Sequence, residues 1–330
     1  MPGGNCQFNS RSGLACASRC PRLPLSALAE ALENQRVDVL IPHFNDADGL
    51  RATLASVAAQ TWEGPVRLVV VDDGSTREQL AQVRAMLGDA SAELLENQRN
   101  RGRPYTRNRL LSAIDSPWVT WLDAGDIWYP QKLEAQLERA CELAHAGKRL
   151  DDHWITCDYD WKWQGRPLHV VVQEIGGDSL SKLLVGKELR AYLWTLLGSA
   201  QSMRKAGAFD EQLPRMQDLD WFVRFISAGG VIDKPRSVSP LPLCRYEKTD
   251  SGRDCAEIHR CNLYLLDKHA ALLEKFGASY LRERKIQADL LALRFAKNNG
   301  DYTAAAGYVL LAAARDPIRT ARQLYKKVRG

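Results

Sequence analysis

Residues 118–130 read WVTWLDAGDIWYP, in which an apolar run suited to a buried strand ends in two carboxylates. Asp123 and Asp126 flank the pair Ala124 and Gly125. In open α/β sheets, ligands bind in the crevice outside the carboxyl ends of the strands. The stretch therefore predicts a buried strand whose end carries acidic side chains into a binding site.

Upstream of this stretch, short β-rich runs alternate with longer helical runs, starting at residue 37. The runs VDVLI (37–41) and RLVVV (67–71) are expected to be strands, and residues 46–60 between them are expected to form a helix. Such alternation indicates βαβ units and a largely parallel sheet. The remaining expected helices cover about 76–87, 104–114 and 130–145, and the remaining expected strands cover 92–96, 154–159 and 168–172.

The 330 residues suffice for one main domain and a smaller appendage, because single hydrophobic cores stop growing at about 250–300 residues. We expect the main domain over residues 37–250. Strand signals stop near residue 250, so residues 251–330 are expected to be a helical region that ends in a basic tail. Residues 1–36 contain arginines but no apolar signal-peptide core, and we expect a disordered N-terminal extension.

The net charge of +5 fits anionic partners such as nucleotide phosphates or membrane lipids without selecting among them. The last sixteen residues (315–330), RDPIRTARQLYKKVRG, hold six Lys or Arg against one Asp. Such a segment suits either an interfacial helix on anionic lipid or a solvated basic tail. Because only this short tail is strongly basic, a nucleic-acid partner is not expected. Eight cysteines in a chain of this length make no disulfide framework, which favours reduced thiols in the cytoplasm.

Two other acidic clusters occur, VVVDDGST around Asp72 and MQDLDWF around Asp218. The first also follows an expected strand, so in a parallel sheet it would lie at the same edge as Asp123. Carboxylates without nearby histidines suit hard cations such as Mg²⁺ and Mn²⁺, which commonly bridge them to substrate phosphates. Taken singly, each cluster also fits a structural role, as a strand-to-helix turn or a helix cap. Only their combination indicates a site for a nucleotide diphosphate.

Several motifs, taken in order, resemble those of the family 2 glycosyltransferases of the GT-A fold. They run from residue 37 to about residue 250 and read VDVLIPHFND, SVAAQTW, VVVDDGST, NRGRPYTRN, WLDAGDIWYPQKL, GAFDEQL and QDLDWFVRF. The resemblance implies a Rossmann-like α/β domain over residues 37–250, with a mostly parallel sheet flanked by helices. It also implies a hexosyltransferase-type enzyme that moves a sugar from a nucleotide-diphosphate sugar to an acceptor hydroxyl, with inversion at the anomeric carbon.

By the same resemblance, residues from several motifs contact the nucleotide. A loop of four residues would lie against the base: Pro42, His43, Phe44 and Asn45. Asp73 would hydrogen-bond the base, with Asp72 as the neighbouring alternative. Arg107 would either contact the nucleotide or hold the acidic edge together, and Asp123 would contact the ribose or a metal-bound water.

The stretch WLDAGD resembles the family's metal motif, usually aspartate, any residue, aspartate, but its third position is Gly125. An acid follows at Asp126, so Asp123 and Asp126 are the predicted ligands of a divalent cation, Mn²⁺ or Mg²⁺. Asp218 matches the position of the family's catalytic base. A single base fits an inverting mechanism, in which Asp218 accepts the proton of the attacking hydroxyl.

The resemblance suggests a role in synthesis of bacterial lipopolysaccharide or another cell-surface polysaccharide, with a glycan or glycolipid acceptor and a UDP-sugar as the favoured donor. The expected location is the cytoplasm, with peripheral contact to the inner face of the cytoplasmic membrane through residues 315–330. Two alternatives stay open. Gly125 is compatible with a degenerate relative that binds a nucleotide-sugar without turnover, although Asp218 argues against it. A nucleotidyltransferase is less favoured, because IPHFNDADG lacks a glycine-rich, basic phosphate loop.

Overall fold

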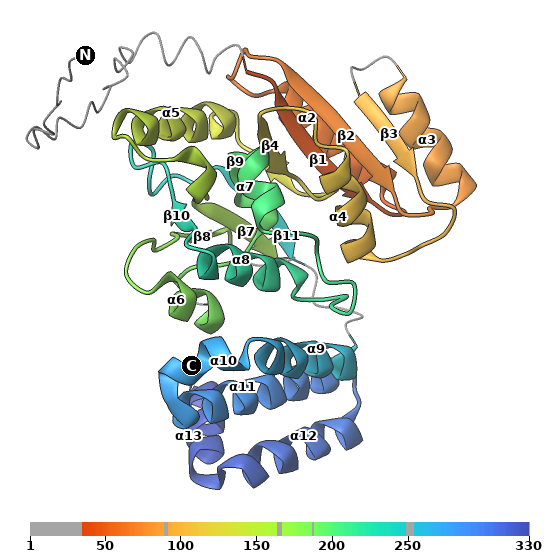
Figure 1. Ribbon diagram of the computed structural model, residues 1–330. Coiled ribbons are helices and arrows are strands. Elements are labelled where there is room, and N and C mark those ends of the chain that lie inside the picture. The colour runs from red at the N-terminus through yellow and green to blue at the C-terminus, as the bar shows by residue number, and fades with distance from the viewer. Residues whose placement is uncertain (1–34, 89–91, 164–166, 187, 249–253, 330) are drawn as a thin grey trace, which may run out of the picture.

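A computed structural model describes most of the chain and shows two sheets and a group of C-terminal helices (Figure 1). The predicted N-terminal extension, residues 1–36, lies almost entirely outside the described residues. The described residues are 35–88, 92–163, 167–186, 188–248 and 254–329.

The larger sheet has seven strands in the order β10-β6-β9-β4-β1-β2-β3. Its centre is parallel, as predicted, because β1 pairs in parallel with both β2 and β4, and β2 pairs in parallel with β3. Only β9 runs antiparallel to its two neighbours, β4 and β6. The bounds are β1 Val37–His43, β2 Val66–Asp72, β3 Ala92–Glu96, β4 Trp118–Trp121, β6 His153–Ile155, β9 Leu197–Ser199 and β10 Val231–Asp233.

Helices cover both faces of this sheet, which explains why its central strands are apolar throughout. Along β1, Val39 and Ile41 pack in one hydrophobic core cluster while Leu40 packs in the other, as the alternation of side chains in a strand requires. The first cluster receives α2, α3 and α5, and the second receives α4, α7 and α8. Their bounds are α2 Ala47–Ala58, α3 Arg77–Leu87, α4 Arg103–Ser112, α5 Lys132–His145, α7 Ala200–Lys205 and α8 Gln217–Ser227.

A second sheet of four strands, in the order β5-β11-β7-β8, lies beside the first and was not predicted as a separate unit. The single strand expected over residues 154–159 was wrong, because β6 ends at Ile155 in the large sheet and β7 begins at Tyr159 in the small one. Both strands contain apolar residues, so the composition of the sequence does not show that the chain passes from one sheet to the other between them. The bounds are β5 Ile127–Trp128, β7 Tyr159–Trp163, β8 His169–Val171 and β11 Cys244–Lys248.

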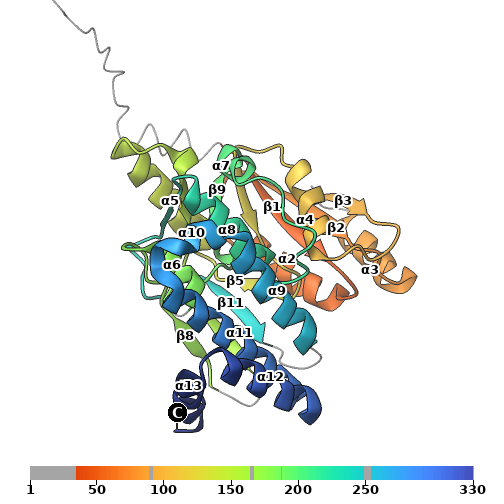
Figure 2. The same cartoon turned by 60° about the horizontal axis from the view of Figure 1, so that its bottom comes forward.

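The C-terminal region is helical, as predicted, and packs against α6 (Ser179–Val185) and α8 (Figures 1 and 2). A shared core cluster joins Leu184 and Val223 of those two helices to Cys261 and Leu265 of α9. Among the described residues, none of the helices is long and apolar enough to cross a membrane. The bounds are α9 Cys255–Lys268, α10 Ala270–Leu273, α11 Gly277–Asn298, α12 Tyr302–Arg315 and α13 Pro317–Arg329.

Candidate active site

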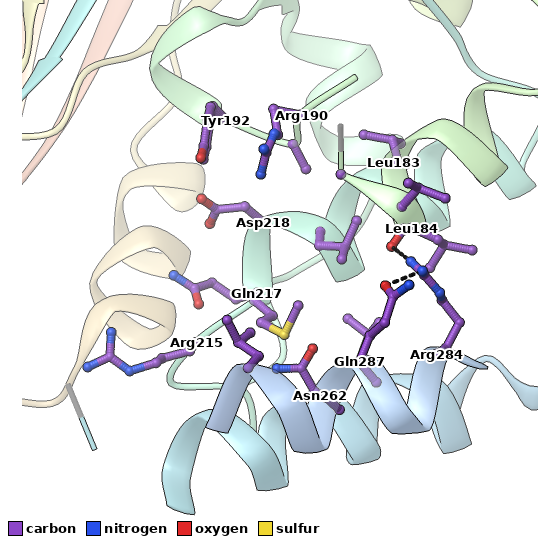
Figure 3. A pocket seen from close by; sticks show the side chains of 18 of the residues that line it. Leu183, Leu184, Arg190, Tyr192, Arg215, Gln217, Asp218, Asn262, Arg284 and Gln287 are labelled. Carbon is purple, nitrogen blue, oxygen red and sulfur yellow. Dashed lines mark hydrogen bonds between the residues drawn. The ribbon is translucent and has the colours of Figure 1, made fainter. Parts of the chain in front are cut away.

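The carboxyl ends of the central strands bring the predicted motifs to one edge of the sheet. In the parallel register of β1 and β2, His43 lies opposite Asp72. Asp123 follows β4, which is the other neighbour of β1. A cavity of about 870 Å³ opens beside this edge and is lined by Asp123, by Asp218 at the start of α8, and by residues of the C-terminal helices (Figure 3).

Arg107 joins the two carboxylates that line this cavity. Its side chain is almost fully buried, and it donates from Nη2 to both oxygens of Asp123 at 3.0 and 3.1 Å. Its Nη1 donates to Asp218. Burial disfavours the charged guanidinium, but Asp218 and Asp123 raise the pKa of Arg107. This geometry corresponds to the second predicted role of Arg107, which was to hold the acidic edge together.

Asp218 is the carboxylate whose environment suits proton transfer. Its side chain is 23% exposed, so it is accessible from the cavity. Burial raises the pKa of Asp218, although the charge of Arg107 acts in the opposite direction. A general base works best when its pKa is moved toward the working pH, and this shift has that direction.

Asp220, two residues further along α8, has a structural environment instead. Its side chain is fully buried and accepts from Arg224 Nε at 3.0 Å and from Lys268 Nζ at 3.0 Å, and it lies 2.8 Å from His269 Nε2. Burial opposes its ionisation, but the bonds to His269 and Lys268 and the charge of Arg224 lower the pKa of Asp220 to about 2. Asp220 therefore fixes α8 to the junction between α9 and α10.

The loop predicted to lie against a nucleotide base is held by hydrogen bonds to the turn after β2. His43 Nδ1 lies 2.8 Å from Asp72 Oδ1, and Asn45 Oδ1 accepts from the Thr76 amide at 2.8 Å. Burial opposes ionisation of Asp72, but its bonds to His43 and Ser75 lower its pKa. Pro42 is half-buried and Phe44 is 45% exposed. Phe44 thus has the most exposed ring in this loop.

Asp73 is nearly buried and orders the loop before α4. Its Oδ1 accepts from Asn97 Nδ2 at 2.7 Å and from the Arg101 amide at 2.8 Å, and its Oδ2 accepts from the Gly102 amide at 2.9 Å. These bonds give Asp73 a structural function in the ligand-free chain. Contact between Asp73 and a base stays a prediction.

The two predicted metal ligands lie in different environments. Asp123 lines the cavity, whereas Asp126 is only 7% exposed and is absent from the cavity lining. Gly125 between them has a φ of +94°, which favours glycine. No group of three or more His, Cys, Asp or Glu in the described part of the chain is arranged to hold a metal ion. Mg²⁺ is often held by one or two carboxylates plus substrate phosphates, and of the two predicted ligands only Asp123 lines the cavity, where both its oxygens accept from Arg107. Metal binding stays a prediction.

Several features of the cavity carried no recognisable sequence signal. The rings of Tyr192 and Trp194 are stacked with centroids 5.1 Å apart, and Tyr246 continues the stack beside Trp194 at 5.9 Å. All three line the cavity and form an aromatic wall next to Asp218. Arg190 and Arg284 also line it, from a loop and from α11. None of these residues belongs to a recognised motif, and they meet only through long-range packing.

The fold is that of the GT-A class of glycosyltransferases. A solved structure with this fold is the mannosyltransferase PcManGT from Pyrobaculum calidifontis in complex with GDP-Man and Mn²⁺. The TM-score is 0.51 and the sequence identity 19%, and the match covers 89% of this chain and 80% of that one. Residues 38–165 match the family described as Glycosyl transferase family 2, and the chain carries a family 2 glycosyltransferase domain.

Related sequences include proteins named for cell-surface polysaccharide synthesis. TuaG of Bacillus subtilis, named for teichuronic acid biosynthesis, is 32% identical over 34% of this chain and 47% of its own length. WfgD of Escherichia coli, named a UDP-Glc:alpha-D-GlcNAc-diphosphoundecaprenol beta-1,3-glucosyltransferase, is 28% identical over 32% of this chain and 41% of its own. The first curated relatives are matched over 28% to 60% of their lengths, less than two thirds in every case.

Proposed function

We propose that this protein is an inverting, hexosyltransferase-type enzyme that moves a sugar from a nucleotide-diphosphate sugar to an acceptor hydroxyl. The observation that carries the proposal is the bridge made by Arg107 between Asp123 and Asp218. One guanidinium thus holds both Asp123, which follows a strand and suits the donor side, and Asp218, whose pKa is raised. Both carboxylates line the same cavity, so the proposed donor side and the proposed base adjoin.

In this proposal Asp218 accepts the proton of the acceptor hydroxyl as that oxygen attacks the anomeric carbon. The bond to the diphosphate breaks on the opposite side of the sugar, so the configuration inverts. Arg107 holds Asp218 in place and carries a permanent positive charge beside the leaving group. Tyr192 and Tyr246, the partly exposed members of the aromatic wall, offer apolar rings against which a sugar can pack.

The donor site is proposed to use the residues predicted from the motifs. The base would lie against the loop from Pro42 to Asn45, within reach of Asp72 and Asp73. Asp123 would hold a divalent cation, Mg²⁺ or Mn²⁺, with Asp126 as the second predicted ligand. Such an ion, when bound, neutralises charge on a departing diphosphate. We propose a UDP-sugar as donor, which is supported by the UDP-Glc in the name of WfgD.

The proposed setting is synthesis of a cell-surface polysaccharide or lipopolysaccharide, which the names of TuaG and WfgD support. The proposed location is the cytoplasmic side of the membrane. The domains proposed for this task are the glycosyltransferase domain over residues 37–250 and the helical region over 251–330. The acceptor would be a glycan or glycolipid.

A thermal-shift panel tests the donor site directly. We expect one class among UDP-, GDP-, dTDP- and CMP-sugars to raise the Tm by about 5 °C at roughly 100 times its Kd, because the ligand binds only the folded chain. Mn²⁺ should enlarge the rise, and Asp123→Asn should remove that metal-dependent part. Each variant is compared with its own ligand-free Tm.

Asp126→Asn is the matched variant in this panel. If it keeps the Mn²⁺-dependent rise, Asp123 alone contacts the ion, and if it loses the rise, both predicted ligands contribute. A wild-type protein that no nucleotide-sugar stabilises, with or without Mn²⁺, would contradict the proposed donor site. A protein that binds a nucleotide-sugar but transfers nothing would be the degenerate binding relative.

Contact with a membrane is proposed through residues 315–330, which include α13. Ile318 is 66% exposed and Tyr325 is 56% exposed, and they are seven residues apart on one face of α13. Arg322 lies between them on the same face, so apolar and cationic side chains occur together, as in interfacial helices.

Cosedimentation with anionic phosphatidylglycerol vesicles should fall about tenfold for Ile318→Ser/Tyr325→Ser, since two apolar side chains no longer insert. Tyr302→Ser, which alters an equally exposed residue at the start of α12, should bind as wild type does, and equal binding by all three proteins would refute this contact.

A further inference from the structure

The cavity extends from the candidate catalytic residues toward the C-terminal helices. Its lining includes Asp123 and Asp218 and also Arg294 of α11 and Gln323 of α13. None of the residues predicted to contact the nucleotide base lines it, since the lining contains no residue from 42–45 or 72–73. We therefore assign the part of the cavity lined by the C-terminal helices to the acceptor side of Asp218.

Positive charge dominates the titratable groups of the cavity. Six arginines face three carboxylates among the described lining residues. Arg107 is already paired with Asp123 and Asp218, and Arg215 pairs with Glu257 at 2.6 Å. The arginines are Arg103, Arg107, Arg190, Arg215, Arg284 and Arg294, and the carboxylates are Asp123, Asp218 and Glu283.

Arg284 is a buried cation without a carboxylate partner among the described residues. It is only 8% exposed, and its Nη1 donates to the carbonyl of Leu184 at 2.7 Å. Its Nη2 donates to Gln287 Oε1, and its Nε has no partner in the described part of the chain. Burial lowers the pKa of Arg284. A charge buried with one donor unused costs folding free energy, and an anion bound in the cavity would offset that cost.

Arg190 approaches the cavity from the opposite wall. Figure 3 shows its side chain extending beside Tyr192 toward Asp218. Within the described residues it forms no salt bridge, its side chain donates no hydrogen bond, and its buried Nε has no partner. Its guanidinium is thus free to bind a ligand that reaches Asp218.

We propose that Arg190 and Arg284 form an anion subsite that binds a phosphate or diphosphate group carried by the acceptor. The inference rests on the proposed function, because it takes Asp218 as the base and names the class of molecule that Asp218 deprotonates. Guanidinium groups match phosphate oxygens through paired N–H donors, and two of them suit a group with several charged oxygens better than a lone carboxylate.

Leucines line the same cavity as the two arginines, which favours a phosphate attached to a hydrocarbon chain. Leu183 and Leu184 of α6 line it from one side, and Leu266 of α9 and Leu291 of α11 line it from the other. Gln323 of α13, the helix proposed to contact the membrane, also lines the cavity. A phosphate on a soluble glycan would use the same arginines but not these leucines.

Calorimetric titration of the full chain tests the subsite without measuring transfer. The protein is first saturated with UDP, and then inorganic phosphate or farnesyl phosphate is titrated into it. We expect Arg190→Gln to weaken binding of both probes about tenfold, the loss typical of one charge-assisted contact. Arg284→Lys should weaken binding similarly while keeping a cation at that position. Arg282→Gln, which alters an exposed arginine on α11 outside the cavity, should bind as wild type does.

The outcomes separate this inference from the proposed function. Farnesyl phosphate that binds more tightly than phosphate identifies a lipid-linked acceptor, and equal affinities identify a phosphorylated glycan; both support the subsite. Affinities unchanged in Arg190→Gln and Arg284→Lys, or lowered equally in Arg282→Gln, would overturn it. The initial UDP titration reports on the donor site alone, so its failure counts against the proposed function rather than against the subsite.

Discussion

Replacing Asp218 with asparagine is expected to lower kcat about 10²–10⁴-fold, the usual contribution of a general base. Asparagine keeps the size of the side chain and can still accept a hydrogen bond from Arg107, but it cannot accept the proton of the acceptor. The donor should bind as before, because its proposed contacts lie at the strand ends. Nucleoside diphosphate release with acceptor present is measured for both proteins at saturating donor.

The matched control for this variant is Glu142→Gln, which neutralises a carboxylate on α5 outside the cavity lining. The side chain of Glu142 is 52% exposed and pairs with Arg139, so it has no contact with the reacting groups. We expect kcat to be unchanged within about a factor of two, as for a surface charge. If Asp218→Asn transferred sugar at the wild-type rate, Asp218 would not be the base.

Asp218 and Asp220 show what a motif can and cannot predict. Both belong to QDLDWF and lie on the first turn of α8. The resemblance to the family selected Asp218, while the structure supplies the physical difference between the two. Asp220 is fully buried among three basic side chains, whereas Asp218 meets one guanidinium and the cavity. Their pKa values shift in opposite directions for that reason.

The central part of the fold was predictable because its signals are local. Runs such as VDVLI and RLVVV are strands whose apolar residues face helices on both sides, and the acidic residues after them mark the strand ends. The convergence of Asp72 and Asp123 on one edge followed from the parallel pairing alone. The helical character of the C-terminal region was predictable from its spacing in the same way.

The acceptor side of the site was not predictable, because it depends on contacts between distant segments. Arg190 follows a loop after α6, and Arg284 lies on α11, nearly a hundred residues later. Neither occurs in a motif, and a lone arginine on a helix usually indicates a solvated face. Only the packing of α9 and α11 against α6 and α8 turns Arg284 inward.

Replacing Arg107 with glutamine is expected to move the acid limb of the pH–rate profile to higher pH. Arg107 favours the charged form of Asp218, so its removal raises the pKa of that carboxylate further above the usual aspartate range. The base acts when deprotonated, so the rate falls as the pH drops through this pKa, and the fall then begins at a higher pH. At a fixed pH near neutrality, kcat/KM should decrease at least tenfold, since Asp123 also loses its partner.

Arg107→Lys separates the charge of this residue from its geometry. Lysine keeps a cation near Asp218, so the acid limb should stay close to that of the wild type. In Arg107, Nη2 donates to both Asp123 oxygens while Nη1 donates to Asp218. The single ammonium group of lysine cannot reproduce this planar arrangement, so kcat/KM should still fall. The pH dependence of kcat/KM for the three proteins provides the comparison. An acid limb in Arg107→Gln at or below the wild-type position would mean that Asp218 does not control the rate, and that the bridge serves only to hold α4, β4 and α8 together.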